Sequence, residues 1–131
     1  MNNLKIIGSS DTFFTPHVDF NATEGVCTIS GESYLENTVE FYKQLLTWLE
    51  EYMGSHQTID FHFNLSYFNT TSSKSILQIL LLLRKHKDTG KDVKVTWHYN
   101  PDDEDMREEA EDYELDSGLK LNIVGDLITD V

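Results

Sequence analysis

The clearest pattern along the chain is an alternation of apolar and polar residues over 58–66. The apolar positions are Ile59, Phe61, Phe63 and Leu65. A period of two is typical of a strand with one buried face. The next segment, 69–73, reads Asn-Thr-Thr-Ser-Ser, and such residues favour turns and helix caps. From Lys74 the pattern is apolar on almost every side, which predicts a helix over 73–87 buried against a sheet.

Upstream of this unit, the pattern predicts an antiparallel hairpin. One strand is expected over 16–20 and another over 26–30, with a turn at 23–25 between them and Gly31 ending the second strand. A short apolar segment, 4–7, precedes the hairpin. The amino-terminal part of the chain is therefore expected to be β-structure.

A first helix is expected to start at Asn37. Glu40 lies three residues further on, which is the spacing of a capping box, and Gly54 is expected to end the helix in a left-handed conformation. Apolar residues recur between them at spacings of three and four, as on the buried face of a helix. They are Val39, Tyr42, Leu45, Leu46, Leu49 and Met53.

The second half of the chain repeats the alternation of strand and helix. A strand is expected over 93–99, a helix from Asn100-Pro101 onward, and a short strand over 119–124. Met106, Ala110 and Tyr113 are spaced to share one face of that helix. The fold class is α/β, with an amino-terminal antiparallel hairpin joined to a mixed sheet in a single domain, 1–131.

The charge of the chain limits its partners. There are 23 acidic residues against 10 Lys and Arg, and the net charge is −13. Nucleic acids and anionic membranes are bound through basic surfaces, so neither is expected as a partner. The single cysteine, Cys27, lies in an expected strand and is interpreted as a core residue. The amino terminus does not resemble a signal peptide, and a cytoplasmic location is expected.

Two features of the sequence are candidates for catalytic or metal sites. His62 and His98 lie opposite the apolar face of their strands and could meet on neighbouring strands as a metal site, although no cysteine or carboxylate constellation accompanies them. The acidic residues of 102–116 have few aromatic neighbours, which favours a solvated face over an acid or base with a shifted pKa. No phosphate-binding glycine loop and no nucleophile elbow is found. No metal and no cofactor is therefore predicted.

The start of the 73–87 helix is the strongest candidate for a functional site. Free backbone N–H groups and the helix dipole make a helix start favourable for a phosphate. Capping by Asn69, Thr70 or Thr71 is the simpler role for the polar residues there. Capping needs only one of the five, so a second role for the hydroxyls stays open.

Three segments of the chain resemble the SiaC family of bacterial regulatory phosphoproteins, small proteins related in fold to the STAS domains of anti-sigma-factor antagonists. The segment 67–74 (YFNTTSSK) resembles the family's loop, 31–37 (GESYLEN) its GxSYPEN segment, and 95–99 (VTWHY) its strand ending in WHY. This chain has Leu35 where the family has proline, and Ser73 where it typically has isoleucine.

The resemblance implies a STAS-like fold and a regulator that is not itself an enzyme. The threonine after the loop asparagine, Thr70 here, is expected to be phosphorylated by a serine/threonine protein kinase and dephosphorylated by a PP2C-type phosphatase, with Thr71 and Ser72 as alternatives. The unphosphorylated form is expected to bind and activate a diguanylate cyclase, raising cyclic di-GMP and favouring biofilm formation.

The expected partner-binding residues lie in two of these segments. They are Tyr67, Phe68, Asn69, Thr70 and Thr71 in the first, and Ser33, Tyr34, Glu36 and Asn37 in the second. A role in turns and capping is the alternative for the second group. Two other functions remain open: an acidic scaffolding or interaction module, and a small metal-dependent hydrolase that uses His62 and His98.

Overall fold

A computed structural model of the protein describes residues 1–10 and 13–127. Within these residues one sheet has six strands in the order β1-β4-β5-β6-β7-β8, and β2 pairs with β3 separately. The strands are β1 (Leu4–Ile6), β2 (Ser9–Ser10), β3 (Phe14–Thr15), β4 (His17–Asn21), β5 (Val26–Ser33), β6 (Thr58–Phe68), β7 (Asp92–His98) and β8 (Asn122–Val124). The first two pairings of the sheet are antiparallel and the last three are parallel, which confirms the predicted hairpin and mixed sheet.

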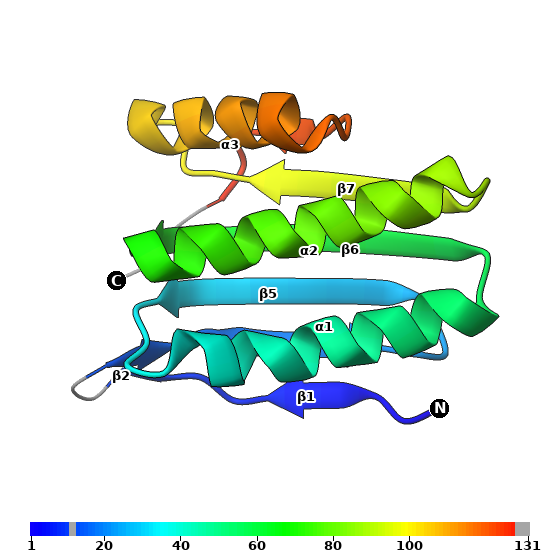
Figure 1. Ribbon diagram of the computed structural model, residues 1–131. Coiled ribbons are helices and arrows are strands. Elements are labelled where there is room, and N and C mark those ends of the chain that lie inside the picture. The colour runs from blue at the N-terminus through cyan, green and yellow to red at the C-terminus, as the bar shows by residue number, and fades with distance from the viewer. Residues whose placement is uncertain (11–12, 128–131) are drawn as a thin grey trace.

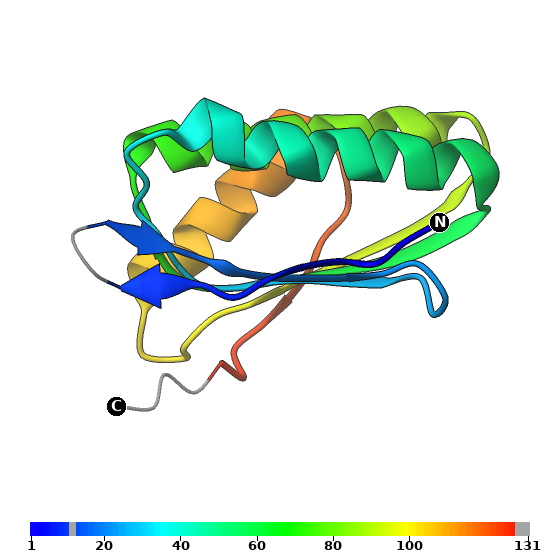
Figure 2. The same cartoon turned by 90° about the horizontal axis from the view of Figure 1, so that it is seen from below.

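Helices follow β5, β6 and β7. They are α1 (Thr38–Ser55), α2 (Thr70–Asp88) and α3 (Glu104–Ser117). All three lie on one face of the sheet, with α1 and α2 side by side (Figures 1 and 2). This arrangement puts the hydrophobic core in the layer between the sheet and the helices.

The core contains the residues that the alternating pattern predicted. Ile59, Phe61, Phe63 and Leu65 of β6 are all buried, and Cys27 is a buried free thiol on the neighbouring strand. Aromatic rings continue the core toward α3, because Trp97 stacks on Phe63 with ring centroids 4.7 Å apart. The core is therefore built around β6.

The boundaries of α1 differ from the predicted ones. The helix starts at Thr38 as expected, but the Asn37 side chain makes no capping hydrogen bond, so no capping box forms. Gly54 is an ordinary helical residue and not a left-handed stop. The helix continues to Ser55 because the Lys91 ammonium hydrogen-bonds the carbonyl groups of Met53 and His56 at its end. Val39, expected in the core, is exposed.

The starts of the other two helices also differ from the predicted ones. α2 begins at Thr70 and not near Ser73, so the hydroxyl residues form its first turn. α3 begins after Asp103, whose side chain accepts a hydrogen bond from Met106 N at 3.1 Å, so Asn100-Pro101 does not start it. The predicted inner face of α3 is confirmed, because Met106, Ala110 and Tyr113 are buried.

Gly118 and Gly54, at the ends of two helices, differ in backbone conformation and surroundings. Gly118 follows α3 with φ +71°, and a Cβ there would also collide with the Arg84 guanidinium. Gly54 is helical with open space around it. We expect Gly118→Ala to lower the free energy of unfolding by about 1–2 kcal/mol and Gly54→Ala to raise it by about 0.5–1 kcal/mol. Urea denaturation of the two variants measures both; a loss of stability in Gly54→Ala would contradict this account.

Candidate functional site

The candidate site lies where β5 and β6 end and α1 and α2 begin. The two strands are parallel neighbours, so their carboxyl ends lie at the same edge of the sheet. Each strand leads into its helix within a few residues, β5 through 34–37 and β6 through Asn69. The two sequence segments that carry the expected partner-binding residues therefore meet at one end of the molecule (Figure 1).

An irregularity in the pairing of β5 with β6 shapes this end. Gly31 pairs with Leu65, but Glu32 pairs with Tyr67, so β6 has one extra residue at Ser66. The extra residue reverses the alternation of faces. Gly31, with φ +94°, lies inside β5 at this shift and does not end the strand.

The reversal sends the last two residues of β6 in different directions. Phe68 turns toward the helices and packs with Trp97 and Tyr113, with ring centroids 6.2 and 6.0 Å apart. Tyr67 turns outward and is 47% exposed. Of the two aromatic residues expected at the site, Tyr67 is the accessible one and Phe68 is half-buried.

Three buried hydroxyl groups fix the start of α2 to the end of β5. Ser33 Oγ donates to Ser72 Oγ at 2.8 Å, and Ser72 Oγ donates to the Ser33 carbonyl at 3.0 Å. The Tyr42 hydroxyl of α1 lies 2.8 Å from Ser33 Oγ. If Tyr42 is the donor, each hydroxyl gives one hydrogen bond, so the buried groups are satisfied.

Ser33 and Ser72 therefore have a different role from the expected one. Both side chains have no exposed surface. A partner cannot contact Ser33, and a kinase cannot reach Ser72, without opening the fold. We accordingly leave Ser33 out of the contact surface and Ser72 out of the modification sites.

The other two candidate hydroxyls, Thr70 and Thr71, are both exposed but differ in their contacts. Thr71 Oγ1 lies 3.0 Å from Thr38 Oγ1 of α1 and donates to Asn69 Oδ1 at 3.2 Å. The Asn69 side chain also accepts from Ser72 N at 3.0 Å, so Asn69 caps α2. Within the part of the chain that the structure describes, the Thr70 hydroxyl has no hydrogen bond and points to solvent.

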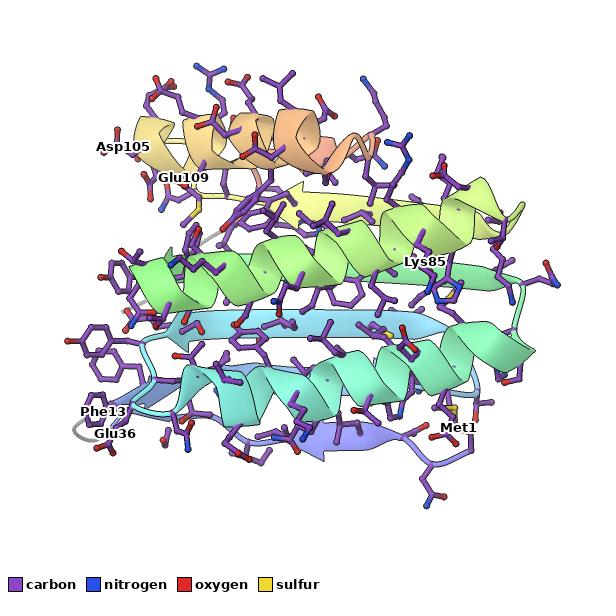
Figure 3. All side chains as sticks on the ribbon, viewed as in Figure 1. Met1, Phe13, Glu36, Lys85, Asp105 and Glu109 are labelled. Carbon is purple, nitrogen blue, oxygen red and sulfur yellow. The ribbon has the colours of Figure 1, made fainter. Side chains whose placement is uncertain are left out.

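A group of aromatic rings lies at the same end of the molecule, where β5 and β6 end. Tyr34 is 40% exposed, and its ring centroid is 6.3 Å from that of Tyr67 and 5.9 Å from that of Phe13. Phe14 completes the group, because it exchanges two backbone hydrogen bonds with Tyr34. We call Phe13, Phe14, Tyr34 and Tyr67 the aromatic cluster. Figure 3 places Phe13 at the end of the molecule where α1 starts, with Glu36 nearby.

The sequence analysis missed Phe13 and Phe14. Their only signal was two adjacent aromatic residues just before the strand expected over 16–20. Glu36 and Asn37, which were expected to bind a partner, are exposed. Leu35, at the position of the family's proline, is partly buried and packs on the core.

Ser73, which stands where the family typically has isoleucine, faces α3. Its hydroxyl lies 2.8 Å from the Tyr113 hydroxyl of α3, and Tyr113 also donates to the Ser73 carbonyl at 3.1 Å. Burial raises the pKa of Tyr113, and the hydrogen bond to Ser73 opposes that rise. The substitution thus gives α2 a polar contact with α3.

His62 and His98 do meet, on the face of the sheet opposite the helices. His62 Nδ1 lies 2.9 Å from His98 Nε2, and His98 Nδ1 lies 2.7 Å from Asp126 Oδ1. His62 Nε2 is 3.0 Å from Asp60 Oδ1, although the geometry is not that of a hydrogen bond. The ring nitrogens face one another or a carboxylate. Among the residues described, no group of three or more His, Cys, Asp or Glu could hold a metal.

The acidic residues of α3 lie mostly on the outside of the molecule, as Asp105 and Glu109 show in Figure 3. Arg107 forms ion pairs with Glu104 and Glu111 at 2.7 and 3.1 Å. These exposed pairs contribute little to stability. No helix within residues 1–10 and 13–127 has the length and apolar character needed to span a membrane.

The fold and the site define a small α/β domain with hydroxyl groups and aromatic rings gathered at one end. The sequence of residues 9–125 matches the SiaC family of regulatory phosphoproteins, and the chain belongs to this family. A relative in Pseudomonas aeruginosa strain UCBPP-PA14, described as an uncharacterized protein, is 32% identical over 124 residues, which are 94% of this chain and 96% of the relative.

Solved structures agree with this membership. Apo-SiaC from Pseudomonas aeruginosa is 30% identical, with a TM-score of 0.85, covering 95% of this chain and 99% of that one. A chain in the complex of the diguanylate cyclase SiaD with its activator SiaC, also from Pseudomonas aeruginosa, is 29% identical with a TM-score of 0.82, covering 91% and 98%. The predicted α/β fold and family resemblance are thus confirmed.

The cap of α2 can be tested against a matched position on α1. Asn69 and Asn37 occupy the same place before their helices, but only the Asn69 side chain accepts a backbone N–H. We expect Asn69→Ala to lower the free energy of unfolding by about 1 kcal/mol. Asn37→Ala is expected to change it by less than about 0.5 kcal/mol. Chemical denaturation measures both, and equal losses would contradict the assignment of the cap.

The buried Tyr42 hydroxyl makes stability depend on pH in the alkaline range. Burial raises the pKa of Tyr42 from 10.0 to about 12, and the hydrogen bond to Ser33 opposes that rise. The unfolded chain therefore loses this proton at a lower pH than the folded chain. The free energy of unfolding should fall as pH rises from 10 toward 12, by up to about 1.4 kcal/mol per pH unit for this group.

Tyr42→Phe is the test of this dependence. The variant should be less stable than the wild type near neutral pH, because it lacks the hydrogen bond to Ser33, but its stability should fall less steeply above pH 10. Tyr113 and Cys27, whose pKa values burial also raises, are present in both proteins, so part of the pH dependence remains in the variant. Denaturant titrations at a series of pH values give the slopes. Identical slopes would show that Tyr42 does not carry the effect.

Proposed function

We propose that this protein activates a diguanylate cyclase and that phosphorylation of Thr70 controls the activation. A serine/threonine kinase adds the phosphate and a PP2C-type phosphatase removes it. The unphosphorylated form binds the cyclase, raising cyclic di-GMP and favouring biofilm formation. The protein acts in the cytoplasm as a regulator, not as an enzyme. Membership of a family of regulatory phosphoproteins and the solved complex of SiaD with its activator SiaC support this proposal.

The observation that carries the proposal is the position of Thr70. It is exposed at the first residue of α2, and in the described structure its hydroxyl is free, whereas Thr71 is hydrogen-bonded and Ser72 is buried. A kinase needs an accessible hydroxyl. The exposed rings of Tyr34 and Tyr67, at the same end of the molecule, offer a partner apolar surface.

A phosphate at this position would change binding without disturbing the fold. It adds about −1.5 to −2 charges and three acceptor oxygens. The start of α2 tolerates negative charge because of the helix dipole and the free N–H groups. A docked partner would have to desolvate the phosphate, which costs several kcal/mol. The exposed position thus separates the effect on binding from the effect on folding.

The two alternative functions have less support. A hydrolase that uses His62 and His98 needs an open metal position, but the rings face each other and the carboxylates of Asp60 and Asp126. An acidic scaffold would rest on the exposed acidic residues of α3, and Arg107 already pairs with two of them. The other contacts of the α3 residues do not indicate a basic partner.

The proposal predicts how substitutions at Thr70 separate binding from folding. Thr70→Asp and Thr70→Glu should weaken binding to the cognate cyclase at least tenfold, because they place a negative charge where the partner docks. Their melting temperatures should stay within a few degrees of the wild type. Isothermal titration calorimetry measures the binding, and differential scanning calorimetry measures the melting.

Thr70→Ala is the matched control, since it cannot carry a phosphate and adds no charge. It should bind the cyclase like the wild type and stay bound in the presence of kinase and ATP. Mass spectrometry of the wild type treated with its kinase should find the phosphate on Thr70. Phosphate on Thr71 alone, or full binding by the phosphorylated protein, would contradict the proposal.

A further inference from the structure

Two adjacent threonines, Thr70 and Thr71, begin α2, and both are exposed. Their Cα atoms are about 3.8 Å apart, as across any trans peptide bond, so a kinase that approaches one threonine also approaches the other. Exposure alone therefore does not explain why a kinase would modify Thr70 and not Thr71. The two hydroxyls differ instead in their hydrogen bonds.

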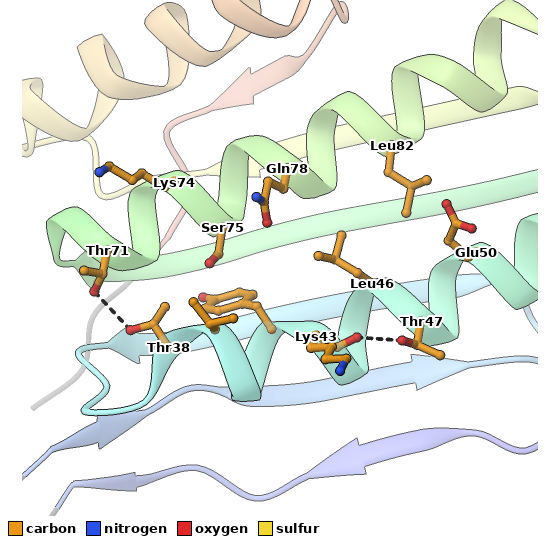
Figure 4. A pocket seen from close by; sticks show the side chains of 12 residues that line it. Thr38, Lys43, Leu46, Thr47, Glu50, Thr71, Lys74, Ser75, Gln78 and Leu82 are labelled. Atoms are coloured by element: carbon orange, nitrogen blue, oxygen red, sulfur yellow. Dashed lines mark hydrogen bonds between the residues drawn. The ribbon is translucent and has the colours of Figure 1, made fainter.

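The Thr71 hydroxyl is hydrogen-bonded in two directions. It donates to Asn69 Oδ1 at 3.2 Å, and its oxygen lies 3.0 Å from Thr38 Oγ1 at the start of α1 (Figure 4). A hydroxyl has only one proton to donate. Because the Thr71 proton is on the Asn69 side, Thr38 is the donor in the second contact. Thr71 thus uses both its proton and a lone pair of its oxygen.

The position of Thr38 suits this contact. It is the first residue of α1, and only 6% of its surface is exposed. The other acceptor near its hydroxyl, the Leu35 carbonyl, is 3.4 Å away, which is long for a hydrogen bond from a hydroxyl. The shorter distance favours donation to Thr71. A buried residue of α1 therefore restrains an exposed residue of α2.

Phosphoryl transfer needs the proton and the lone pair of the threonine that reacts. The threonine oxygen bonds to the γ-phosphorus of ATP, the bond from that phosphorus to the β–γ bridging oxygen breaks, and its electron pair leaves on ADP. The hydroxyl proton passes to a base of the kinase. Thr71 must first break its two hydrogen bonds, whereas in the described structure the Thr70 hydroxyl makes none. A net hydrogen bond corresponds to a factor of about five, and two correspond to a factor of about 25.

A phosphate on Thr71 would also disturb the contacts that the hydroxyl makes. Once esterified, Thr71 Oγ1 has no proton to donate, so Asn69 Oδ1 would lose this donor. The phosphate would also lie next to the buried side chain of Thr38. A phosphate on Thr70 would break no hydrogen bond of the described residues. Reactant and product thus both favour Thr70.

We propose that Thr38 is a positioning residue that directs phosphorylation to Thr70, because its hydrogen bond to Thr71 makes the Thr71 hydroxyl less reactive. This inference rests on the proposed function and names a residue that selects its site. Asn69 supplies the other hydrogen bond but also caps α2. Thr38 is therefore the residue whose contact can be removed with the cap left in place.

The test is the ratio of phosphate on Thr71 to phosphate on Thr70 within one sample. The full-length protein is treated briefly with its cognate kinase and ATP, and fragment-ion mass spectrometry assigns the phosphate. Because both threonines are on the same molecule, a change in kinase binding cancels in the ratio. The ratio should be about 1 to 25 or lower in the wild type, and should rise about fivefold in Thr38→Val, which lacks the hydroxyl.

Two further variants separate the hydrogen bond from other effects of the substitution. Thr38→Ser keeps the hydroxyl and should keep the wild-type ratio. Thr47→Val removes a hydroxyl that donates to the Lys43 carbonyl within α1 at 2.9 Å, and its ratio should stay within twofold of the wild type. Circular dichroism melting checks that the variants fold. Thr38→Ala replaces Thr38→Val if the latter is unfolded, with the same expected rise.

The outcomes separate this inference from the proposed function. If Thr70 carries the phosphate but the ratio in Thr38→Val equals that of the wild type, the role of Thr38 is overturned and the proposed function stands. A rise in Thr38→Ser or Thr47→Val as large as that in Thr38→Val would also overturn the role of Thr38. Phosphate on Thr71 alone, or on neither threonine, would overturn both.

Discussion

The hydrogen bonds between Ser33 and Ser72 are the interaction on which the geometry of the whole candidate site depends. They join residues 39 positions apart in the sequence, at the end of β5 and the start of α2, without exposure to water. Because buried hydroxyls are costly when unpaired, separating the two segments would be unfavourable. Asn69 N also donates to the Ser33 carbonyl at 3.1 Å, so the cap of α2 is fixed by the same residue.

With this constraint, the proposed phosphorylation would not need to change the shape of the protein. The first turn of α2 is hydrogen-bonded to Ser33 of β5 and to Thr38 of α1. A phosphate on Thr70, as proposed, would lie on the exposed side of that turn and would break none of these contacts. Its effect on a partner would be electrostatic and local, through the charge and the solvation of the phosphate. If a partner binds this end of the molecule as proposed, little free energy would be spent on ordering a turn that is already fixed.

The sequence predicted the features that depend on local patterns and missed those that depend on pairing between distant segments. The buried residues of β6 and of the inner face of α3 could be predicted from the sequence. In a strand or a helix that is buried on one face, apolar residues recur with the period of that structure. The meeting of His62 and His98 followed from their common face on neighbouring strands. The extra residue at Ser66, which exposes Tyr67, could not be predicted, because it is defined by how β5 pairs with β6. Gly54 continues a helix because Lys91, from a distant segment, satisfies the carbonyls at the helix end.

The run of hydroxyl residues at the start of α2 was the hardest part of the sequence to interpret, and helix geometry explains it. Successive side chains of a helix point about 100° apart. Thr70 accordingly faces solvent, Thr71 faces Thr38 of α1, Ser72 faces the end of β5, and Ser73 faces Tyr113 of α3. Three of the four hydroxyls attach the turn to three different elements of the fold. Within the described residues, Thr70 is the one of the four whose hydroxyl makes no hydrogen bond, so it is exposed and free for a modifying enzyme.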